Sequence, residues 1–467
     1  AYAFVDFLEK AHQKCWQILP ISPTSYGDSP YQSFSVHAGN PYFIDLEALE
    51  KEGYLKPAEY KDIEWGDDKG SVDYGKIYEV IFKVLRTAHK RFRKKPEKAY
   101  SKFVVENKDW IYDYALFMSL KFANKGKAWY EWDEPLKMYK PKAIKSARKE
   151  YANDIDFWCF VQYKYFQQWK KLKAYANEKG IEIIGDIPIY VAYDSVEVWS
   201  TPQYFSLDKE KKPVEVAGCP PDAFTADGQL WGNPLYNWEY IARDKFRWWV
   251  ERIKAASNTY DVVRIDHFRG FESYYCIPYG AKNAKKGKWR KGPDMRLFKE
   301  VRKQLGDVKI IAEDLGFLTK HVVKMLNASG YPGMKVLEFG FDSDNTNGYL
   351  PHNFKTTNSI CYTGTHDNET ILGWIKSCDE KTRSYCKDYL GVTKDEFVPW
   401  AMVRLCWSSV CDTAIAQMQD ILCLDDKARM NTPSTVGANW KWRLESFDKL
   451  DDTLAERLAK ITAVYGR

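Results

Sequence analysis

The chain has 467 residues, 70 of them basic and 64 acidic, with a formal net charge of +6. This near balance leaves no basic surface of the kind that binds nucleic acid, so no nucleic-acid partner is expected. The sequence has no apolar run of the roughly 18 residues that a membrane helix needs, so no membrane partner is expected either. At about 100–200 residues per domain, the length suits two or three domains, or one large α/β barrel with insertions.

Aromatic residues make up 16% of the chain, with 18 Trp and 32 Tyr. A large packed core accounts for most of them, and a sugar ligand, whose apolar C–H faces suit aromatic rings, is the other use we consider. The ten cysteines form no C-x-x-C pair, which argues against a zinc or redox site, and free thiols suit a reducing compartment. We therefore expect a cytoplasmic protein. The chain begins at Ala1 without Met or a signal pattern, so a plastid is the alternative if a transit peptide precedes it.

Short apolar runs that end in polar or acidic residues recur along the chain, and they predict buried strands. They span residues 16–20, 181–186, 262–266, 309–313, 335–338, 360–364 and 421–424. Amphipathic stretches precede three of them, at residues 160–179, 295–305 and 321–328. Strand alternating with helix predicts an α/β fold with a parallel sheet.

Seven runs are one short of the eight strands of a (β/α)8 TIM barrel, so the first strand is expected to be missing from this chain. An open doubly wound sheet is the alternative, but no G-x-G-x-x-G follows any run, and the barrel is favoured. Residues 50–155 have helical periodicity and predict an inserted helical subdomain, which leaves 1–49 and 156–467 as the barrel. Residues 199–240 are rich in Pro, Gly, Asn and Trp, and predict a long ordered loop that forms a lid over the active site.

Acidic residues stand at the carboxyl ends of the predicted strands, where barrels of this type carry their catalytic groups. They are Asp186, Asp266, Glu313, Glu338 and Asp367. One such acid often only caps the following helix, whereas several at one barrel mouth repel one another and need compensation or a use. Two carboxyls that flank a bond are the pattern of glycoside cleavage, in which one attacks and the other transfers the proton of the leaving group.

Basic side chains lie beside two of these acids. Arg264 precedes Asp266 by two residues, and positions i and i+2 of a strand share a face. Arg264 is therefore expected to hold Asp266 ionised, and a plain salt bridge is the simpler interpretation of the same contact. His267 and His366 are natural donors to sugar hydroxyls. Their spacing does not suit a metal site, and neither a metal nor a cofactor is expected.

Two turn-rich segments carry aromatic residues that suit a sugar ring. Residues 218–236 hold Trp231, which either packs inward or stacks on a sugar as part of a stiff lid. Residues 23–31 place Tyr26 and Tyr31 in a similar setting. A phosphate-binding loop and a Ser-His-Asp spacing of the hydrolase type are both absent from the sequence.

Several motifs follow one another in a fixed order along nearly the whole chain. The longest are V-V-R-I-D-H-F-R-G at 262–270, I-A-E-D-L-G at 311–316 and Y-T-G-T-H-D-N at 362–368. Others are S-P-Y-Q-S-F at 29–34, G-N-P at 39–41, P-P-D-A-F at 220–224, G-Q-L-W-G-N-P at 228–234 and A-R-M-N at 428–431. One motif alone is weak, but the ordered set is specific. It resembles amylomaltase, also called disproportionating enzyme, a 4-α-glucanotransferase family (glycoside hydrolase family 77) of the α-amylase-like clan.

The resemblance implies a retaining double displacement that moves α-1,4-glucan segments to the 4-hydroxyl of an acceptor. Asp266 matches the nucleophile, Glu313 the acid/base, and Asp367 the carboxylate that holds the 2- and 3-hydroxyls of the distorted sugar. Retention predicts carboxyls of Asp266 and Glu313 about 5–5.5 Å apart, and a raised pKa for Glu313. The implied partners are maltooligosaccharides, starch- or glycogen-derived α-1,4 glucans and, as acceptor, glucose.

The resemblance also implies a set of substrate-binding residues. These are Arg264 and His366 around the scissile ring, Tyr31 in an aromatic loop, and Asp222, Gln229 and Trp231 in a lid over the acceptor side. An α-1,4-glucan hydrolase with the same carboxylates and a non-catalytic glucan-binding protein are the alternatives. A lid that excludes water favours transfer over hydrolysis. The chain departs from the family in lacking its opening strand and Gly/Pro loop, which would leave two unpaired barrel edges.

Overall fold

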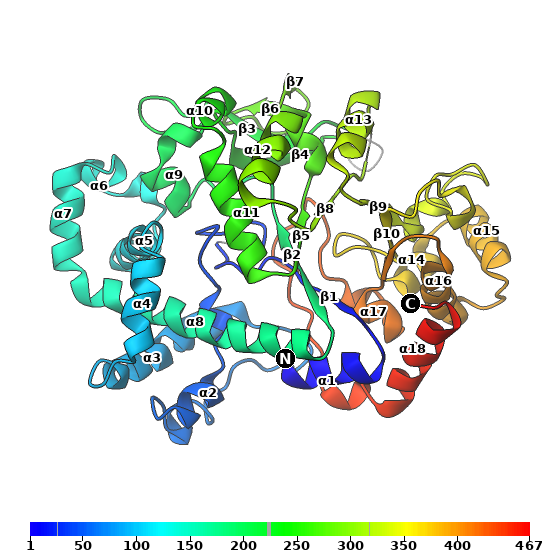
Figure 1. The fold of residues 1–467 in the computed structure, drawn as a ribbon, viewed down its shortest axis with the longest axis horizontal. Helices are drawn as coiled ribbons and strands as arrows, with labels where there is room; N and C mark the ends of the chain where they lie inside the picture. The colour runs from blue at the N-terminus through cyan, green and yellow to red at the C-terminus, as the bar shows by residue number, and fades with distance from the viewer. Residues whose placement is uncertain (26, 222–225, 317) are drawn as a thin grey trace.

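Short parallel strands run through the middle of the molecule (Figure 1), and the described part of the chain contains seven of them. The computed structural model describes residues 1–25, 27–221, 226–316 and 318–467. The parallel strands are β1 (Cys15–Gln17), β2 (Glu182–Ile187), β5 (Val262–Ile265), β8 (Ile310–Ala312), β9 (Gly333–Val336), β10 (Ser359–Tyr362) and β11 (Thr413–Ile415). They pair in chain order as β1-β2-β5-β8 and β9-β10-β11. Where the two sheets meet, the N–H of Ala312 donates to the carbonyl of Pro332 (3.0 Å).

The parallel strands enclose one apolar interior to which each of them contributes. Its members are Ile184, Ile311, Met334, Val336, Ile360 and Tyr362, with Cys15, Val262 and Ile415 packed against them. The Tyr362 hydroxyl donates to Gln17 Oε1 (2.9 Å) and so links β10 to β1. Strands far apart in the pairing order therefore meet around a common interior, as they do when a parallel sheet curves into a (β/α)8 barrel.

Helices cover the outside of the parallel strands. Those between β1 and β11 that follow the helical insertion are α8 (Ala152–Glu178), α9 (Val196–Ser200), α10 (Trp238–Arg243), α11 (Arg247–Thr259), α12 (Met295–Leu305), α13 (Lys320–Ser329), α14 (Ile371–Ser377), α15 (Glu380–Leu390) and α16 (Val398–Ser408). Outside that span, α1 (Tyr2–Lys10) packs against α18 (Asp452–Val464). Local sequence sets their ends: the Thr319 hydroxyl caps the start of α13, and Gly330 ends it with a φ of 73°.

A group of helices inserted between β1 and β2 lies at the left of Figure 1. It comprises α2 (Leu46–Lys51), α3 (Tyr74–Phe92), α4 (Lys98–Glu106), α5 (Ile111–Ala123), α6 (Glu134–Lys137) and α7 (Pro141–Glu150). The long helix α8 packs against α3, α4, α5 and α7 before the chain enters β2. Its buried Lys164 reaches Glu52 Oε2 (2.8 Å) and Glu97. The helical content expected of residues 50–155 is present, and their limits as a subdomain remain a prediction.

The segment predicted to be a long loop contains two strands. β3 (Glu215–Cys219) and β4 (Gln229–Pro234) join β6 (Ser273–Pro278) and β7 (Lys288–Lys291) in an antiparallel sheet of order β4-β3-β6-β7. The pairing of β3 with β4 is irregular, because its register shifts between Val216 and Gly218. Glycine and proline within β3 and β4 hide the alternation that marks a strand in sequence.

The seventh predicted strand, at residues 421–424, is wrong. Ile421 ends the short helix α17 (Met418–Ile421), and the parallel strand of this region is β11, a few residues earlier. An apolar run of four residues does not distinguish a strand from a buried helix end. Here the buried Asp420, which accepts a hydrogen bond from the N–H of Ile371 (2.8 Å), ties α17 to the start of α14.

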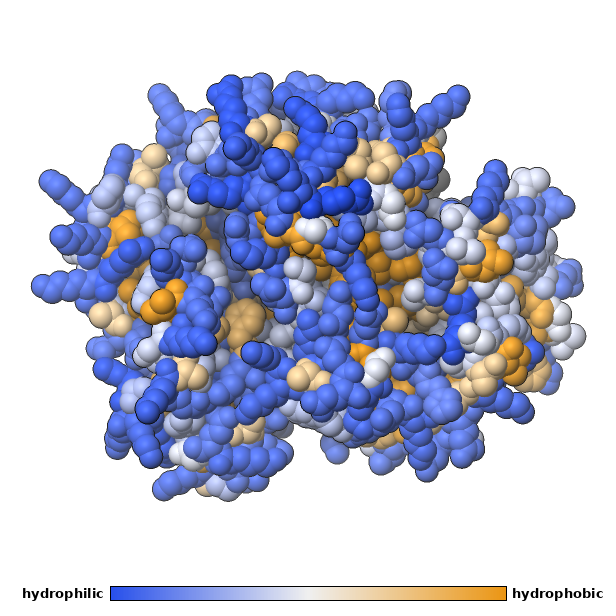
Figure 2. Space-filling view, viewed as in Figure 1, coloured by the Kyte–Doolittle hydropathy of each residue, from blue (hydrophilic) through white to orange (hydrophobic). Residues whose placement is uncertain are grey.

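The face drawn in Figure 2 is mostly hydrophilic, and apolar residues show only in separated patches and hollows. All ten cysteines are free thiols. In the part of the chain that the structure describes, no helix is long and apolar enough to cross a membrane.

Candidate active site

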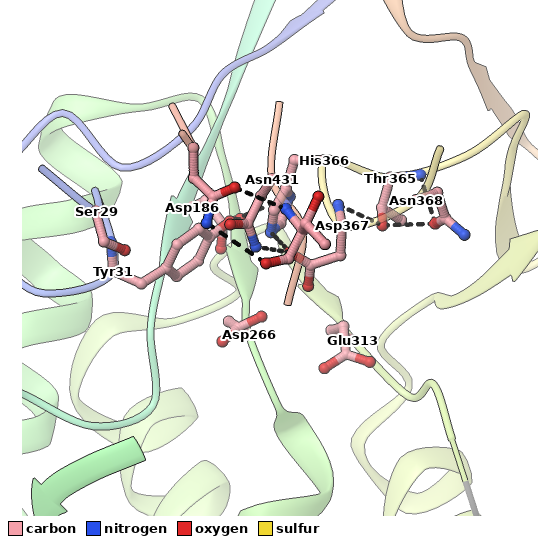
Figure 3. Close-up of polar contacts among 12 residues, drawn as sticks. Ser29, Tyr31, Asp186, Asp266, Glu313, Thr365, His366, Asp367, Asn368 and Asn431 are labelled. Carbon is pink, nitrogen blue, oxygen red and sulfur yellow. Dashed lines mark hydrogen bonds and ion pairs between the residues drawn. The ribbon is translucent and has the colours of Figure 1, made fainter. Parts of the chain in front are cut away.

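Acidic side chains gather at the carboxyl ends of β2, β5 and β8 and at the turn after β10 (Figure 3). The strand ladder continues one residue past β5 and β8. The N–H of Asp266 donates to Ile187 O (3.0 Å), and the N–H of Glu313 donates to Ile265 O (3.1 Å). The parallel pairing itself therefore fixes where Asp266 and Glu313 leave the backbone.

Arg264 joins Asp266 to a second acid. Its Nη1 lies 3.2 Å from Asp266 Oδ1 and 2.5 Å from Asp186 Oδ2, and it is 3% exposed. The shared face predicted for Arg264 and Asp266 is confirmed. The Tyr31 hydroxyl also donates to Asp186 Oδ2 (2.8 Å). Asp186, expected only as a strand-end acid, thus anchors both a cation and an aromatic ring of the site.

Burial and the charge of Arg264 act on the pKa of Asp266 in opposite directions. Burial raises that pKa to about 6, and Arg264 acts in the opposite direction. The expectation that Arg264 holds Asp266 ionised is therefore only partly met. The ion pair favours the carboxylate, but burial outweighs it, and Asp266 is ionised mainly above pH 6.

Glu313 is held by two backbone donors. The N–H of His267 donates to Oε2 and the N–H of Leu315 to Oε1, each at 2.7 Å. His267 adopts a left-handed φ of 51°, which turns the chain sharply after Asp266. Burial first, and then the charge of Asp266, raise the pKa of Glu313 to about 7. The raised pKa predicted for Glu313 is confirmed, and the separation of the two carboxyls remains a prediction.

Asp367 lies on a turn and is more open to solvent. Half of its side chain is exposed, and Asn431 Nδ2 donates to its Oδ1 (2.6 Å). His366 Nε2 lies 3.4 Å from the same oxygen, and Arg429 Nη2 donates to the Asp367 carbonyl (2.9 Å). The A-R-M-N motif drew attention to Arg429 and Asn431, but no feature of that motif indicates that they contact Asp367.

Two aromatic rings flank His366. Tyr31 stacks on it with centroids 4.9 Å apart and an interplanar angle of 23°. Trp440 lies 5.7 Å from the Tyr31 ring and 5.8 Å from the His366 ring. The structure thus brings Tyr31 and His366 together as the sequence predicts. It adds Trp440, which was not predicted because no motif distinguishes it among the 18 tryptophans.

Trp231 reaches the site from β4. Its ring meets His267 edge to face at 4.9 Å, and its Nε1 donates to Gln229 Oε1 (3.0 Å). The ring is half-buried, so it neither packs wholly inward nor stands free. Gln229 and Trp231 therefore lie together next to the residue that follows Asp266. Asp222 and Tyr26, also expected at the site, lie outside the described residues.

Over residues 1–25, 27–221, 226–316 and 318–467, no group of three or more His, Cys, Asp or Glu side chains could hold a metal ion. The functional groups of the site are carboxyls, imidazoles, amides, the guanidinium groups of Arg264 and Arg429, and aromatic rings. Such a set can transfer protons, stabilise a developing positive charge and bind hydroxyls and C–H faces.

A parallel barrel that carries one buried and one half-buried carboxyl of raised pKa among aromatic rings belongs to the class of carbohydrate-active barrel enzymes. Comparison with known proteins makes this assignment specific. A family model described as 4-alpha-glucanotransferase matches residues 1–449, and the chain belongs to this family. Members of this family are enzymes of glucan transfer, as the sequence motifs predict.

Curated relatives carry the same name across bacteria and plants. The 4-alpha-glucanotransferase of Clostridium butyricum is 48% identical over 471 residues, covering 100% of this chain and 96% of that protein. A chloroplastic or amyloplastic 4-alpha-glucanotransferase of Arabidopsis thaliana is 39% identical, covering 100% of this chain and 82% of that protein.

Solved structures agree on the fold. The amylomaltase from Streptococcus agalactiae in complex with acarbose superposes with a TM-score of 0.97 at 42% identity, covering 100% of this chain and 94% of that one. The amylomaltase from Corynebacterium glutamicum, at 16% identity, matches in fold alone with a TM-score of 0.75, covering 99% of this chain and 72% of that one. The (β/α)8-barrel class predicted from the sequence is confirmed.

Proposed function

We propose that the chain transfers α-1,4-glucan segments by a retaining double displacement, with Asp266 as nucleophile, Glu313 as acid/base and Asp367 as the carboxylate that binds the sugar hydroxyls. The observation that carries this proposal is the contrast between the two acids: the Arg264 guanidinium lies 3.2 Å from Asp266, whereas burial and the charge of Asp266 raise the pKa of Glu313. The pKa of Glu313 lies at about 7 and that of Asp266 at about 6. Near neutral pH the pair therefore holds a proton on Glu313 and a negative charge on Asp266.

In the first step Glu313 gives its proton to the glycosidic oxygen while that oxygen leaves C1 of the sugar. A carboxylate oxygen of Asp266 bonds to C1 from the opposite side, which yields a covalent glycosyl-enzyme. In the second step Glu313, now ionised, takes the proton from the 4-hydroxyl of an acceptor, and that oxygen displaces Asp266. Two inversions at C1 give net retention.

The remaining site residues suit binding roles. Arg264 counters the charge of Asp266, while His366 and Asn431 lie beside Asp367 to orient it toward sugar hydroxyls. Tyr31 and Trp231 offer ring faces for the C–H faces of glucose units. Gln229 accepts a hydrogen bond from Trp231 and so orients its ring. We assign Asp222, Gln229 and Trp231 to a lid over the acceptor side, formed by residues 199–240.

We propose maltooligosaccharides and starch- or glycogen-derived α-1,4 glucans as donors, and the same glucans or glucose as acceptors. The similar amylomaltase from Streptococcus agalactiae forms a complex with acarbose, and this likeness supports a ligand site of related chemistry in the present chain. We place the protein in the cytoplasm, which the ten free thiols support, with a plastid as the alternative.

Incubation with maltotriose alone tests the proposal against its nearest competitor. Transfer yields free glucose together with a ladder of longer maltooligosaccharides, because a sugar hydroxyl resolves the glycosyl-enzyme. Glucose and maltose without longer products would mean that water resolves it, and the enzyme would then be a hydrolase. No change in the substrate would favour a glucan-binding protein.

A further inference from the structure

The turn at residues 365–368, which carries Asp367, is organised by the side chain of Asn368. Asn368 Oδ1 accepts two hydrogen bonds from Thr365, one from its N–H (2.9 Å) and one from its hydroxyl (2.8 Å). The Thr365 hydroxyl in turn accepts from the N–H of Asp367 (3.3 Å). The orientation of the Asn368 amide is therefore fixed, with its oxygen toward the turn and its NH2 group toward the protein interior.

The NH2 group of Asn368 needs an acceptor, because the side chain is only 8% exposed. Glu338 supplies it: Asn368 Nδ2 donates to Glu338 Oε1 at 2.7 Å. Glu338 follows β9, and its own N–H donates to Thr363 O (3.3 Å) at the end of β10. A continuous chain of hydrogen bonds thus runs from Glu338 through Asn368 and Thr365 to the backbone of Asp367.

We propose that Glu338 is a positioning residue for the transfer reaction, which accepts the hydrogen bond of Asn368 and so holds the turn that presents Asp367 to the sugar. This rests on the proposed function of Asp367. Glu338 itself touches no substrate under this proposal, because it lies beneath the turn and is 9% exposed.

The surroundings of Glu338 indicate whether the carboxyl that accepts from Asn368 is charged or uncharged. Oε2 has no hydrogen-bond partner among the described residues, and it lies where a Cβ on Gly364 would be 3.6 Å away. Burial raises the pKa of Glu338 to about 8, and the nearby carboxylates of Asp420 and Glu369 act in the same direction. The hydrogen bond from Asn368 and the charge of Arg429 oppose them. At neutral pH the carboxyl is therefore uncharged, and an amide oxygen can replace the acceptor that it provides.

The test compares two substitutions of similar volume. Glu338→Gln keeps an acceptor for Asn368 and should retain kcat within about twofold of the wild type. Glu338→Leu removes the acceptor and should lower kcat for maltotriose by about 10- to 100-fold with little change in KM, because a misplaced Asp367 weakens binding chiefly in the transition state. If Glu338→Leu does not fold, Glu338→Met fills the same space without an acceptor and replaces it.

Two controls separate positioning from general packing. Asp420→Asn alters another buried acid near Glu338, whose partners are the Thr363 hydroxyl (2.7 Å) and the N–H of Ile371, and it should leave kcat unchanged. In an Asp367→Asn background, Glu338→Leu should cause no further loss, because its effect passes through Asp367.

Four results would overturn the proposal: normal kcat in Glu338→Leu, equal losses in the Gln and Leu variants, an equal loss in Asp420→Asn, or the full loss persisting in the Asp367→Asn background. Full activity of Asp367→Asn by itself would instead remove the proposed role of Asp367, so the two failures are distinguishable.

Discussion

Asp266 and Glu313 lie at one barrel mouth, yet different groups stabilise their charged forms. Asp266 has the guanidinium of Arg264 at 3.2 Å, whereas Glu313 accepts two backbone N–H groups and is repelled by Asp266. Burial raises the pKa of both carboxyls, to about 6 and about 7. The charge of Arg264 favours the ionised form of Asp266, and the charge of Asp266 disfavours ionisation of Glu313, so both interactions favour a proton on Glu313.

The pKa order predicts a bell-shaped dependence of kcat/KM on pH. As pH falls through about 6, Asp266 gains a proton and loses its ability to attack C1. As pH rises through about 7, Glu313 loses the proton that the leaving oxygen needs. Initial rates with maltotriose, measured from acid to alkaline pH, should therefore peak between these values. A glycosyl fluoride has a leaving group that needs no acid. With this donor, the glycosylation rate of Glu313→Gln should still fall at low pH, where Asp266 is protonated, but should no longer fall at high pH. An alkaline plateau in the wild type would contradict the assignment of Glu313.

Part of this site could be predicted from the sequence and part could not. The contact of Arg264 with Asp266 follows from two-residue spacing on a strand, and the acids follow from strand ends. Asn431 and Trp440 contact residues far away in sequence, and Asn431 is 64 positions from Asp367. No local pattern encodes such a contact, because it depends on how the segment after α17 packs against the turn that follows β10.

At the scale of elements, the parallel strands were predictable because strands buried on both faces are continuous apolar runs. Six of the seven runs overlap a strand, and the run at 421–424 fails because a short apolar segment also suits a helix end. The antiparallel sheet of β3, β4, β6 and β7 was missed. Its strands β3 and β4 contain Gly218, Gly232 and Pro234, residues that break strand patterns.

Gly218 lies where β3 and β4 approach each other too closely for a larger side chain. A Cβ at this position would lie 2.1 Å from the backbone oxygen of Gln229 and 2.5 Å from Ile277 Cδ1. Gly218→Ala must therefore push β4 away from β3 and shift Gln229 and Trp231. We expect a loss of about 1–3 kcal/mol in unfolding free energy, as in other overpacked sites, together with a lower ratio of transfer to hydrolysis.

Denaturant titration and product analysis with maltotriose measure the two effects. Gly348→Ala is the matched control, since a Cβ there meets nothing within 4 Å, and it should change neither quantity. A stable Gly218→Ala enzyme with an unchanged product ratio would show that the β3–β4 contact does not position the lid.

At the scale of the whole molecule, the parallel arrangement decides where chemistry occurs. The parallel strands of the described residues point the same way around one interior, so the residues that follow them meet at one end. Segments inserted between them supply the rest: Tyr31 from the loop after β1, Trp231 from the antiparallel sheet, and Asn431 from the segment after α17. The central claim is that this assembly passes through a covalent bond to Asp266.

Trapping that intermediate tests the claim most directly. In Glu313→Gln, a glycosyl fluoride can still react with Asp266, but no base remains to activate the acceptor, so the glycosyl-enzyme should accumulate. Intact-protein mass spectrometry should then show an added glycosyl group, and peptide mapping should place it on Asp266. The double variant that adds Asp266→Asn should stay unmodified. Consumption of the donor without an adduct, or an adduct on another carboxyl, would contradict the assignment of Asp266 as the nucleophile.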